Sequence, residues 1–348
     1  MIFEDALSKK ISSGESAPVF MIFGDDAYLK NFYSDKIIKM SFEGDPFFNL
    51  QKFEENADLQ EVYDAINQYP MMADKKCVVL SDYDFEGCSS KEFEKLCTII
   101  DECVDGCTLV LKFDSVEVDN KRSAKAKKLI SSVEKADGFA VRLDHREAAK
   151  LYKMLIDGAE KRSCSLNEVS ARYLVENVGE DIYILKNELD KLCSFVQGGS
   201  IDKEIIDKVC SKSVESSVYD YIKEIIACNI SGAMKLLDDM FYMHVDPMVI
   251  LYNASSSYVD MYRTLSAKRD KIILGDVAKE FNYKNKAFLL DKASYNLRKF
   301  DDKKLLLSFD ALLKADGDLK GFNKDPRTVL EQLTVRLIYI ISKGEKID

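Results

Sequence analysis

The sequence is poor in the residue type on which most catalytic triads and many metal sites depend. Its 348 residues include only two histidines, His145 and His244. They lie far apart in the sequence and in different predicted domains, so neither a histidine-based triad nor a site with several histidine ligands is expected. We interpret both as surface or capping residues.

An excess of positive charge is also missing. The formal net charge is −10, whereas a protein that binds nucleic acid through bulk electrostatics needs clustered lysine and arginine. The sequence begins without a basic region followed by a long apolar run, and no stretch approaches the ~20 apolar residues of a membrane span. We therefore expect a cytoplasmic protein without membrane contact, in which basic surface is local.

The nine cysteines contain no C-x-x-C pair. Cys103 and Cys107 are four positions apart, Cys97 precedes them, and the others lie singly within apolar patterns. The number is also odd. This spacing favours reduced, mostly buried thiols over a metal site, and we expect no metal and no cofactor.

The most informative absence is that of a phosphate-binding loop. Val19–Phe23 is typical of a buried strand, Gly24 follows as a turn, and Asp25 and Asp26 then begin a helix. Nucleotide hydrolases have a glycine-rich loop ending in lysine and serine or threonine at this point, because backbone N–H groups and a lysine must hold phosphates. Two carboxylates suit a helix N-terminus but repel a triphosphate. The pattern predicts a nucleotide-binding fold that does not bind nucleotide.

Strand and helix patterns alternate over residues 1–144. Strands are predicted at 19–23, 49–53, 77–80, 108–113 and 139–143. This alternation predicts a parallel sheet with helices on both faces. After Asp144 the strands stop. Helices are predicted at 146–159, 167–177, 182–195, 203–208, 219–227, 231–243, 247–267, 284–298, 302–320 and 326–342.

The change of element type suggests three domains, at 1–144, 145–212 and 213–348. An apolar content of 47% over 348 residues supports a folded chain with more than one core. The third domain has the longer helical segments.

Two adjacent methionines precede the third predicted strand. Leu59–Tyr69 has the apolar spacing of a helix, Pro70 ends it, and Met71 and Met72 follow in the connection. Periodicity alone favours a place in the core for both methionines. However, two adjacent residues of an extended loop cannot both point inward, and polar residues come next. A protruding methionine pair is an adaptable apolar contact for a partner's pocket.

Five short motifs along the chain follow the order found in one known family. The family's Gly-x-Asp-x-x-x-Leu is matched at 24–29, with the leucine one position early, and its Phe-Asn pair at 48–49. Residues 70–80 match its proline, two large apolar residues and basic pair before an apolar strand, although the family often has Phe or Leu where this chain has methionine. Residues 179–192 and 316–327 resemble its second-domain and last-domain motifs. Over nearly its whole length the chain resembles the delta subunits of the bacterial DNA polymerase III clamp loader.

This resemblance implies an AAA+-like α/β domain at 1–144, a small helical lid domain at 145–212 and an all-α collar domain at 213–348. The collar of this family joins five subunits. The resemblance also implies a non-catalytic subunit without an ATP site or cofactor, whose partners are the gamma/tau ATPase subunits and delta prime.

The implied function is to bind the beta sliding clamp and hold one interface of the ring open, so that it is loaded around primed DNA. The residues assigned to the clamp are Tyr69, Pro70, Met71 and Met72. Contact with DNA is a further expectation: Tyr283, Lys284 and Lys286 place an aromatic ring beside lysines, which allows stacking on a base while the cations meet phosphates. The basic run 121–128 is interpreted as a solvated helix face.

Three other functions fit parts of the sequence. An AAA+ enzyme with an unusual nucleotide site is disfavoured by Asp25 and Asp26. A helical, AAA+-like adaptor without a role in clamp opening would keep Met71 and Met72 in its core. A delta prime subunit has the same architecture, but its usual zinc-binding cysteine cluster is missing here.

Overall fold

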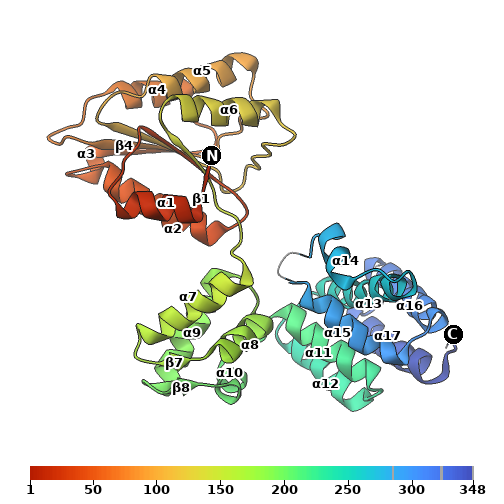
Figure 1. Cartoon of the computed structure of the whole chain (residues 1–348). Helices are drawn as coiled ribbons and strands as arrows, with labels where there is room; N and C mark the ends of the chain where they lie inside the picture. Colours follow the sequence, from red (N-terminus) through yellow and green to blue (C-terminus); the bar gives the residue numbers. More distant parts are fainter. Residues whose placement is uncertain (284–285, 322–323, 347–348) are drawn as a thin grey trace. The chain divides into compact units, whose positions relative to one another are not determined.

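The computed structural model of the protein describes residues 1–283, 286–321 and 324–346 (Figure 1). The chain divides into two compact units, Met1–Arg146 and Glu147–Asp348. No helix in the described ranges is long and apolar enough to cross a membrane.

The first unit, of which every residue is described, is built on a parallel sheet with the strand order β1-β6-β2-β5-β4-β3. The strands are β1 Ile2–Phe3, β2 Val19–Phe23, β3 Leu50–Phe53, β4 Lys76–Ser81, β5 Cys107–Lys112 and β6 Phe139–Arg142. The helices are α1 Glu4–Ser12, α2 Ala27–Ser41, α3 Pro46–Asn49, α4 Leu59–Asn67, α5 Ser90–Asp101 and α6 Ala124–Lys135. This is the α/β fold that the alternating pattern predicts.

Helices cover both faces of this sheet, with α1 and α2 on one face and α4, α5 and α6 on the other (Figure 1). All five residues of β2 are buried, as expected for a central strand between two helical layers. Val19, Met21 and Phe23 belong to one core cluster together with apolar residues of α4, α5 and α6. The alternation of side chains along a strand places Phe20 and Ile22 on the opposite face.

The five predicted strands are confirmed to within two residues at each end. The short strand β1 escaped prediction because two residues carry no periodic signal; it pairs with β6 through Ile2 and Val141. Helix α4 ends at Asn67, so Tyr69 lies outside the helix that the apolar spacing predicts to include it.

The second unit is mainly helical. Its described helices are α7 Ala148–Glu160, α8 Glu168–Val178, α9 Ile182–Val196, α10 Lys203–Val209, α11 Val214–Ile226, α12 Ile230–Tyr242, α13 Pro247–Arg269, α14 Leu274–Glu280, α15 Phe288–Asn296, the 3₁₀ helix η2 Leu297–Lys299, α16 Asp302–Lys320 and α17 Pro326–Lys343. The prediction that strands end at Asp144 is wrong in one detail, because the two-residue strands β7 Ser165–Leu166 and β8 Ser200–Ile201 form a parallel pair.

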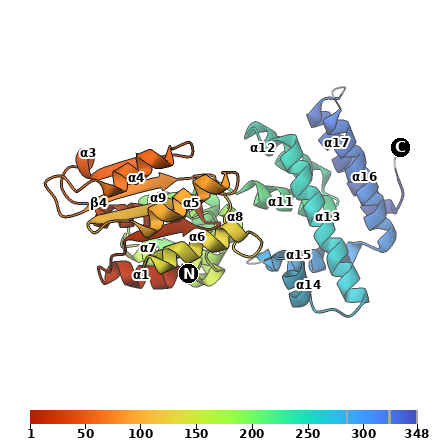
Figure 2. The same cartoon turned by 90° about the horizontal axis from the view of Figure 1, so that it is seen from above.

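The later helices of this unit share one core. Apolar residues from α11, α12, α13, α16 and α17 form a single cluster, and Figure 2 shows the long helices α13, α16 and α17 lying side by side. Within this core Tyr221 and Thr334 share a buried hydrogen bond of 2.6 Å. Helix α14 was not predicted, and the helix predicted at 284–298 begins outside the described residues. The division of this unit at residue 213 stays a prediction.

Candidate functional site

The carboxyl edge of the sheet is where an open parallel sheet binds a nucleotide. It borders a hollow of about 500 Å³, lined by Gly24, Lys30 and Arg142 among others. Gly24 has a φ of +126°, and a Cβ at this position would lie 2.3 Å from the backbone oxygen of Leu143. Only glycine fits such a backbone, and the chain turns tightly here from β2 into α2.

The first helical turn after Gly24 is capped by a side chain of the protein itself. Asp26 is buried and accepts a hydrogen bond of 2.8 Å from the backbone N–H of Leu29. The backbone N–H of Asp26 donates to the oxygen of Leu143 at 3.1 Å, and Nδ1 of His145 lies 3.3 Å from its carboxylate. A phosphate at this helix terminus would compete with the Asp26 carboxylate for the N–H of Leu29.

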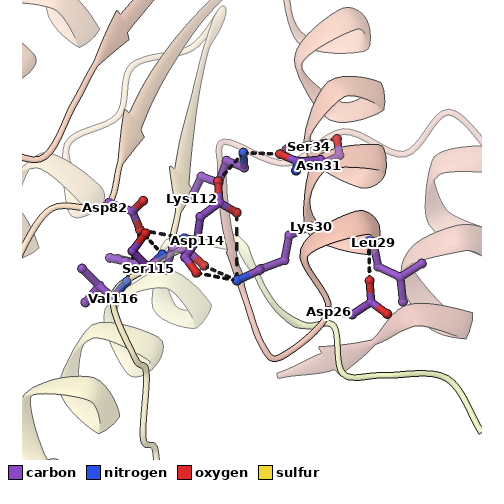
Figure 3. Close-up of polar contacts among 11 residues, drawn as sticks. Asp26, Leu29, Lys30, Asn31, Ser34, Asp82, Lys112, Asp114, Ser115 and Val116 are labelled. Atoms are coloured by element: carbon purple, nitrogen blue, oxygen red, sulfur yellow. Dashed lines mark hydrogen bonds and ion pairs between the residues drawn. The ribbon is translucent and has the colours of Figure 1, made fainter. Parts of the chain in front are cut away.

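Lys30 has the sequence spacing from Gly24 that the lysine of a phosphate-binding loop has from the first glycine of the loop. It lies six positions after Gly24, as the lysine does in the motif G-x-x-x-x-G-K, and the sequence reasoning missed this signal. Its side chain is buried, and Nζ donates hydrogen bonds to the backbone oxygens of Phe113 at 3.0 Å and Asp114 at 2.9 Å (Figure 3). The charge therefore stabilises the end of β5.

A strand-end carboxylate is similarly engaged. In hydrolases of this fold such a group helps to hold magnesium, but here Oδ1 of Asp82 accepts hydrogen bonds from the backbone N–H groups of Asp114 and Ser115 at 2.7 and 2.8 Å (Figure 3). Asp84 accepts from the N–H of Gly87 at 2.8 Å. Both carboxylates stabilise turns, and among the described residues no group of three or more His, Cys, Asp or Glu side chains could hold a metal ion.

The methionine pair lies in an exposed loop between α4 and β4. Tyr69 is 89% exposed, Met71 52% and Met72 98%, while Pro70 is half-buried. The interpretation of both methionines as core residues is therefore wrong, and the prediction of a surface loop is confirmed. Because every pairing in this sheet is parallel and β4 begins at Lys76, the loop lies at the amino edge, opposite to the hollow beside Gly24.

Two hydrogen bonds from the buried side chain of Asn49 hold this loop in place. Asn49, at the end of α3, is 1% exposed; its Oδ1 accepts from the N–H of Met71 at 2.8 Å, and its Nδ2 donates to the oxygen of Met71 at 3.0 Å. Met72 has a φ of +53°, a region that residues other than glycine seldom adopt. The loop is held in one conformation, and that conformation presents Met72 to solvent.

Lys76 anchors the other end of the loop. Its side chain is buried, and Nζ donates a hydrogen bond to the backbone oxygen of Ala65 in the last turn of α4. Burial lowers the pKa of this lysine. The backbone N–H of Lys76 also donates to the oxygen of Gly106 at 2.8 Å. The end of α4 and the start of β4 are thereby joined beneath the exposed residues.

The residues proposed from the sequence to contact DNA lie in the second unit. The hydroxyl of Tyr283 donates a hydrogen bond to the buried carboxylate of Asp260 and accepts one of 2.8 Å from Arg263. Burial and the bond to Asp260 raise the pKa of Tyr283 to about 12. Lys286 forms an ion pair of 2.7 Å with Glu215, and Lys284 lies outside the described residues. Tyr283 and Lys286 each have a partner within the unit, and their contact with DNA stays a prediction.

Known proteins resemble both units of the chain. The family described as DNA polymerase III, delta subunit, matches residues 20–136, and the family of its C-terminal domain matches residues 215–337. No curated protein sequence matches the chain. The solved structure of the Bacillus subtilis DNA clamp loader delta protein is similar over 96% of this chain and 99% of that one, at 20% identity and a TM-score of 0.61, which supports the fold.

Weaker likenesses extend to other proteins. A DNA polymerase III gamma subunit-related protein from Thermotoga maritima is similar over 94% of this chain and 97% of that one, at 12% identity and a TM-score of 0.35. The RuvB Holliday junction branch migration motor of the same organism is similar over 64% and 76%, at 12% identity and a TM-score of 0.38. Neither bears on function at these scores.

Because both family matches fall in their natural order and together cover most of the chain, the protein belongs to the family of DNA polymerase III delta subunits. Members of this family are components of clamp loaders that act in DNA replication.

Proposed function

We propose that this protein binds the beta sliding clamp through the loop Tyr69–Met72 and holds one interface of the ring open for loading onto primed DNA. The observation that carries the proposal is Met72: a large apolar side chain that is 98% exposed on a residue with a φ of +53°. Exposed apolar side chains on strained backbone are typical of contact sites. The loop is held by Asn49 and Lys76, so it is available for binding without prior rearrangement.

The energetics set limits on what the loop does alone. Burying two methionine side chains contributes about 1.5–3 kcal/mol each, which is comparable to the entropic cost of association. Met71 and Met72 are therefore anchors within a larger contact surface. To favour an open ring, the subunit must also bind the open interface better than the closed one, because equal affinity shifts no equilibrium.

We propose further that the subunit is non-catalytic and neither binds nor hydrolyses ATP. A backbone donor of the first helical turn is engaged by Asp26, and the lysine that would meet phosphates is engaged by Phe113 and Asp114. ATP is then handled by the gamma/tau subunits, which together with this chain and delta prime form a hetero-pentamer. In this assembly residues 145–212 act as the lid domain and residues 213–348 as the collar, and the complex works on primed DNA in the cytoplasm.

The test is the affinity of the full chain for the beta clamp of the same organism, measured beside the double variant Met71→Ala, Met72→Ala. We expect at least a tenfold loss of affinity, about 1.4 kcal/mol, at unchanged thermal stability. The matched control is the pair Tyr242→Ala, Met243→Ala, two exposed residues in the second unit, which is expected to keep full affinity. A wild-type chain that does not bind the clamp, or equal losses in both double variants, would overturn the proposal.

A further inference from the structure

An exposed aromatic pair lies on the short helix α3. Phe47 is 83% exposed and Phe48 49%, and their rings meet edge to face with centroids 5.1 Å apart. The helix forms here because Pro46 occupies its first turn and the side chain of Asp45 accepts from the N–H of Phe47 at 2.9 Å. A four-residue helix therefore presents two large apolar rings to solvent.

Hydrogen bonds tie this helix to the methionine loop. Asn49, the last residue of α3, is 1% exposed and exchanges two hydrogen bonds with the backbone of Met71, as two residues of paired strands do. Its Nδ2 also donates to the oxygen of Glu43 at 2.9 Å. One buried amide thus fixes the chain before α3, α3 itself and the loop.

A second connection joins the same two segments. The backbone N–H of Glu43 donates to the oxygen of Lys75 at 3.1 Å, and the side chains of these residues form an ion pair of 3.7 Å. Gly44 packs closely against the loop: a Cβ added to this glycine would lie 3.7 Å from Cβ of Ala73. Because α3 precedes β3 and the loop precedes β4, both segments lie at the amino edge of neighbouring strands.

The clamp contact needs more apolar surface than two methionines, and α4 does not supply it. The apolar residues of α4 are buried in the core of the first unit, as Leu59, Val62 and Ile66 show. Phe47 and Phe48 are exposed apolar side chains of the segment that Asn49 ties to the loop.

We propose that Phe47 and Phe48 form a second half of the clamp-binding surface, and that Asn49 is the positioning residue that holds both halves in one arrangement. The proposal rests on the proposed function, since its occupant is the sliding clamp. The clamp then meets two apolar projections at a fixed spacing: the aromatic pair on α3 and the methionines of the loop. Neither half needs to be ordered on binding, because the hydrogen bonds of the buried Asn49 side chain hold them beforehand.

The first test compares the full-length variants Phe47→Ala and Tyr242→Ala in their affinity for the beta clamp. Both residues are exposed aromatics, so both variants are expected to fold normally. We expect Phe47→Ala to weaken binding about tenfold and Tyr242→Ala to leave it unchanged. If the wild type binds and Met71→Ala, Met72→Ala weakens binding while Phe47→Ala does not, this inference fails and the proposed function stands. If the wild type does not bind the clamp, the proposed function itself fails.

The second test asks whether Asn49 acts through the loop. We expect Asn49→Ala to lower clamp affinity about fivefold with the natural loop, and to cause a much smaller loss when Met71 and Met72 are already alanine. A purely structural effect on folding would give the same fold loss in both backgrounds and would overturn the positioning role. Ser34→Ala is the control, because Ser34 is also buried and donates to a backbone oxygen but within α2; no loss of affinity is expected.

The alternative occupant is a second copy of the chain. Sedimentation of the wild type alone distinguishes the two, and we expect a species whose mass does not change in Phe47→Ala. Self-association that Phe47→Ala abolishes, together with unchanged clamp affinity, would assign the surface to a dimer and overturn the proposal.

Discussion

The ammonium group of Lys30 donates a hydrogen bond of 3.0 Å to the backbone oxygen of Phe113, at the end of β5. A lysine with the same sequence spacing from the glycine neutralises phosphates in nucleotide hydrolases. Here the backbone oxygen of Asp114 also accepts a hydrogen bond from Lys30. The same side chain thus has a structural role on a fold that commonly uses it for chemistry.

The first prediction concerns Lys30→Met. We expect the free energy of unfolding to fall by about 1–3 kcal/mol, because two backbone oxygens lose a charged donor while methionine keeps the apolar volume. Unfolding in urea followed by circular dichroism measures the change. Lys91→Met, on the exposed side of α5, is the control and should stay within about 0.5 kcal/mol of the wild type.

Titration with ATP and Mg²⁺ completes this test. Neither the wild type nor Lys30→Met is expected to bind the nucleotide. Micromolar binding by the wild type that disappears in Lys30→Met would show that Lys30 meets phosphate after all.

A second prediction concerns the turn at Gly24. Gly24→Ala should lower the free energy of unfolding by more than about 3 kcal/mol, because an added Cβ meets the backbone of Leu143 and the φ of +126° disfavours a side chain. Gly14→Ala is the matched control: Gly14 has a φ of +72°, with nothing within 4 Å of the added Cβ. Its expected loss is about 1 kcal/mol. Thermal unfolding of both variants checks the difference, and similar losses would show that φ alone matters at Gly24.

The strands and most long helices could be predicted because their signals are local. Five buried residues at Val19–Phe23 or an apolar stripe along Asp302–Lys320 need no knowledge of the rest of the chain. The exposure of the methionine loop was predictable to a lesser degree. It depended on the polar residues that follow Met72, whereas periodicity favoured the opposite conclusion.

The supports of the site could not be predicted in this way. Asn49 and Met71 are 22 positions apart, and Lys30 and Phe113 are 83 positions apart. The sequence shows an asparagine and a lysine in each case, but not which backbone groups they reach. The same holds for Tyr283. Its neighbours in the sequence suggested an exposed ring, whereas in the structure its hydroxyl is hydrogen-bonded to Asp260 and Arg263. Contacts between distant segments are set by tertiary packing.

A third prediction concerns Tyr283→Phe. The change removes the hydroxyl that donates a hydrogen bond to the buried Asp260 carboxylate and accepts one from Arg263. We therefore expect the free energy of unfolding to fall by about 1–3 kcal/mol at pH 8. The folded-state pKa of Tyr283 is raised to about 12, above the usual value of about 10. The stability that this hydroxyl contributes is therefore fully present below about pH 10 and lost as the pH rises towards 12. Urea unfolding between pH 8 and 12 should show the two proteins converging.

The same variant bears on contact with DNA. Tyr283→Phe keeps the ring, so loading of the clamp on primed DNA should survive if the ring stacks on a base, whereas Tyr283→Ala should lose it with clamp binding retained. Full loading by Tyr283→Ala would leave Tyr283 with a structural role alone.

A final prediction follows from the backbone of Met72. A left-handed residue other than glycine costs about 1 kcal/mol. Met72 has a φ of +53° and is 98% exposed, so burial of its side chain in the free protein does not offset this cost. Met72→Gly should therefore leave the free energy of unfolding unchanged or raise it by up to about 1 kcal/mol, since relief of strain is partly offset by the flexibility of glycine in the unfolded chain. Met72→Ala keeps the strain and should not gain stability.

Both variants should bind the clamp several-fold more weakly than the wild type. The glycine variant should bind the more weakly of the two, because its loop must be ordered on binding. A glycine variant that is less stable than the alanine variant would mean that the side chain of Met72 packs on the protein, and the loop would then be a structural element with no strain held for a partner.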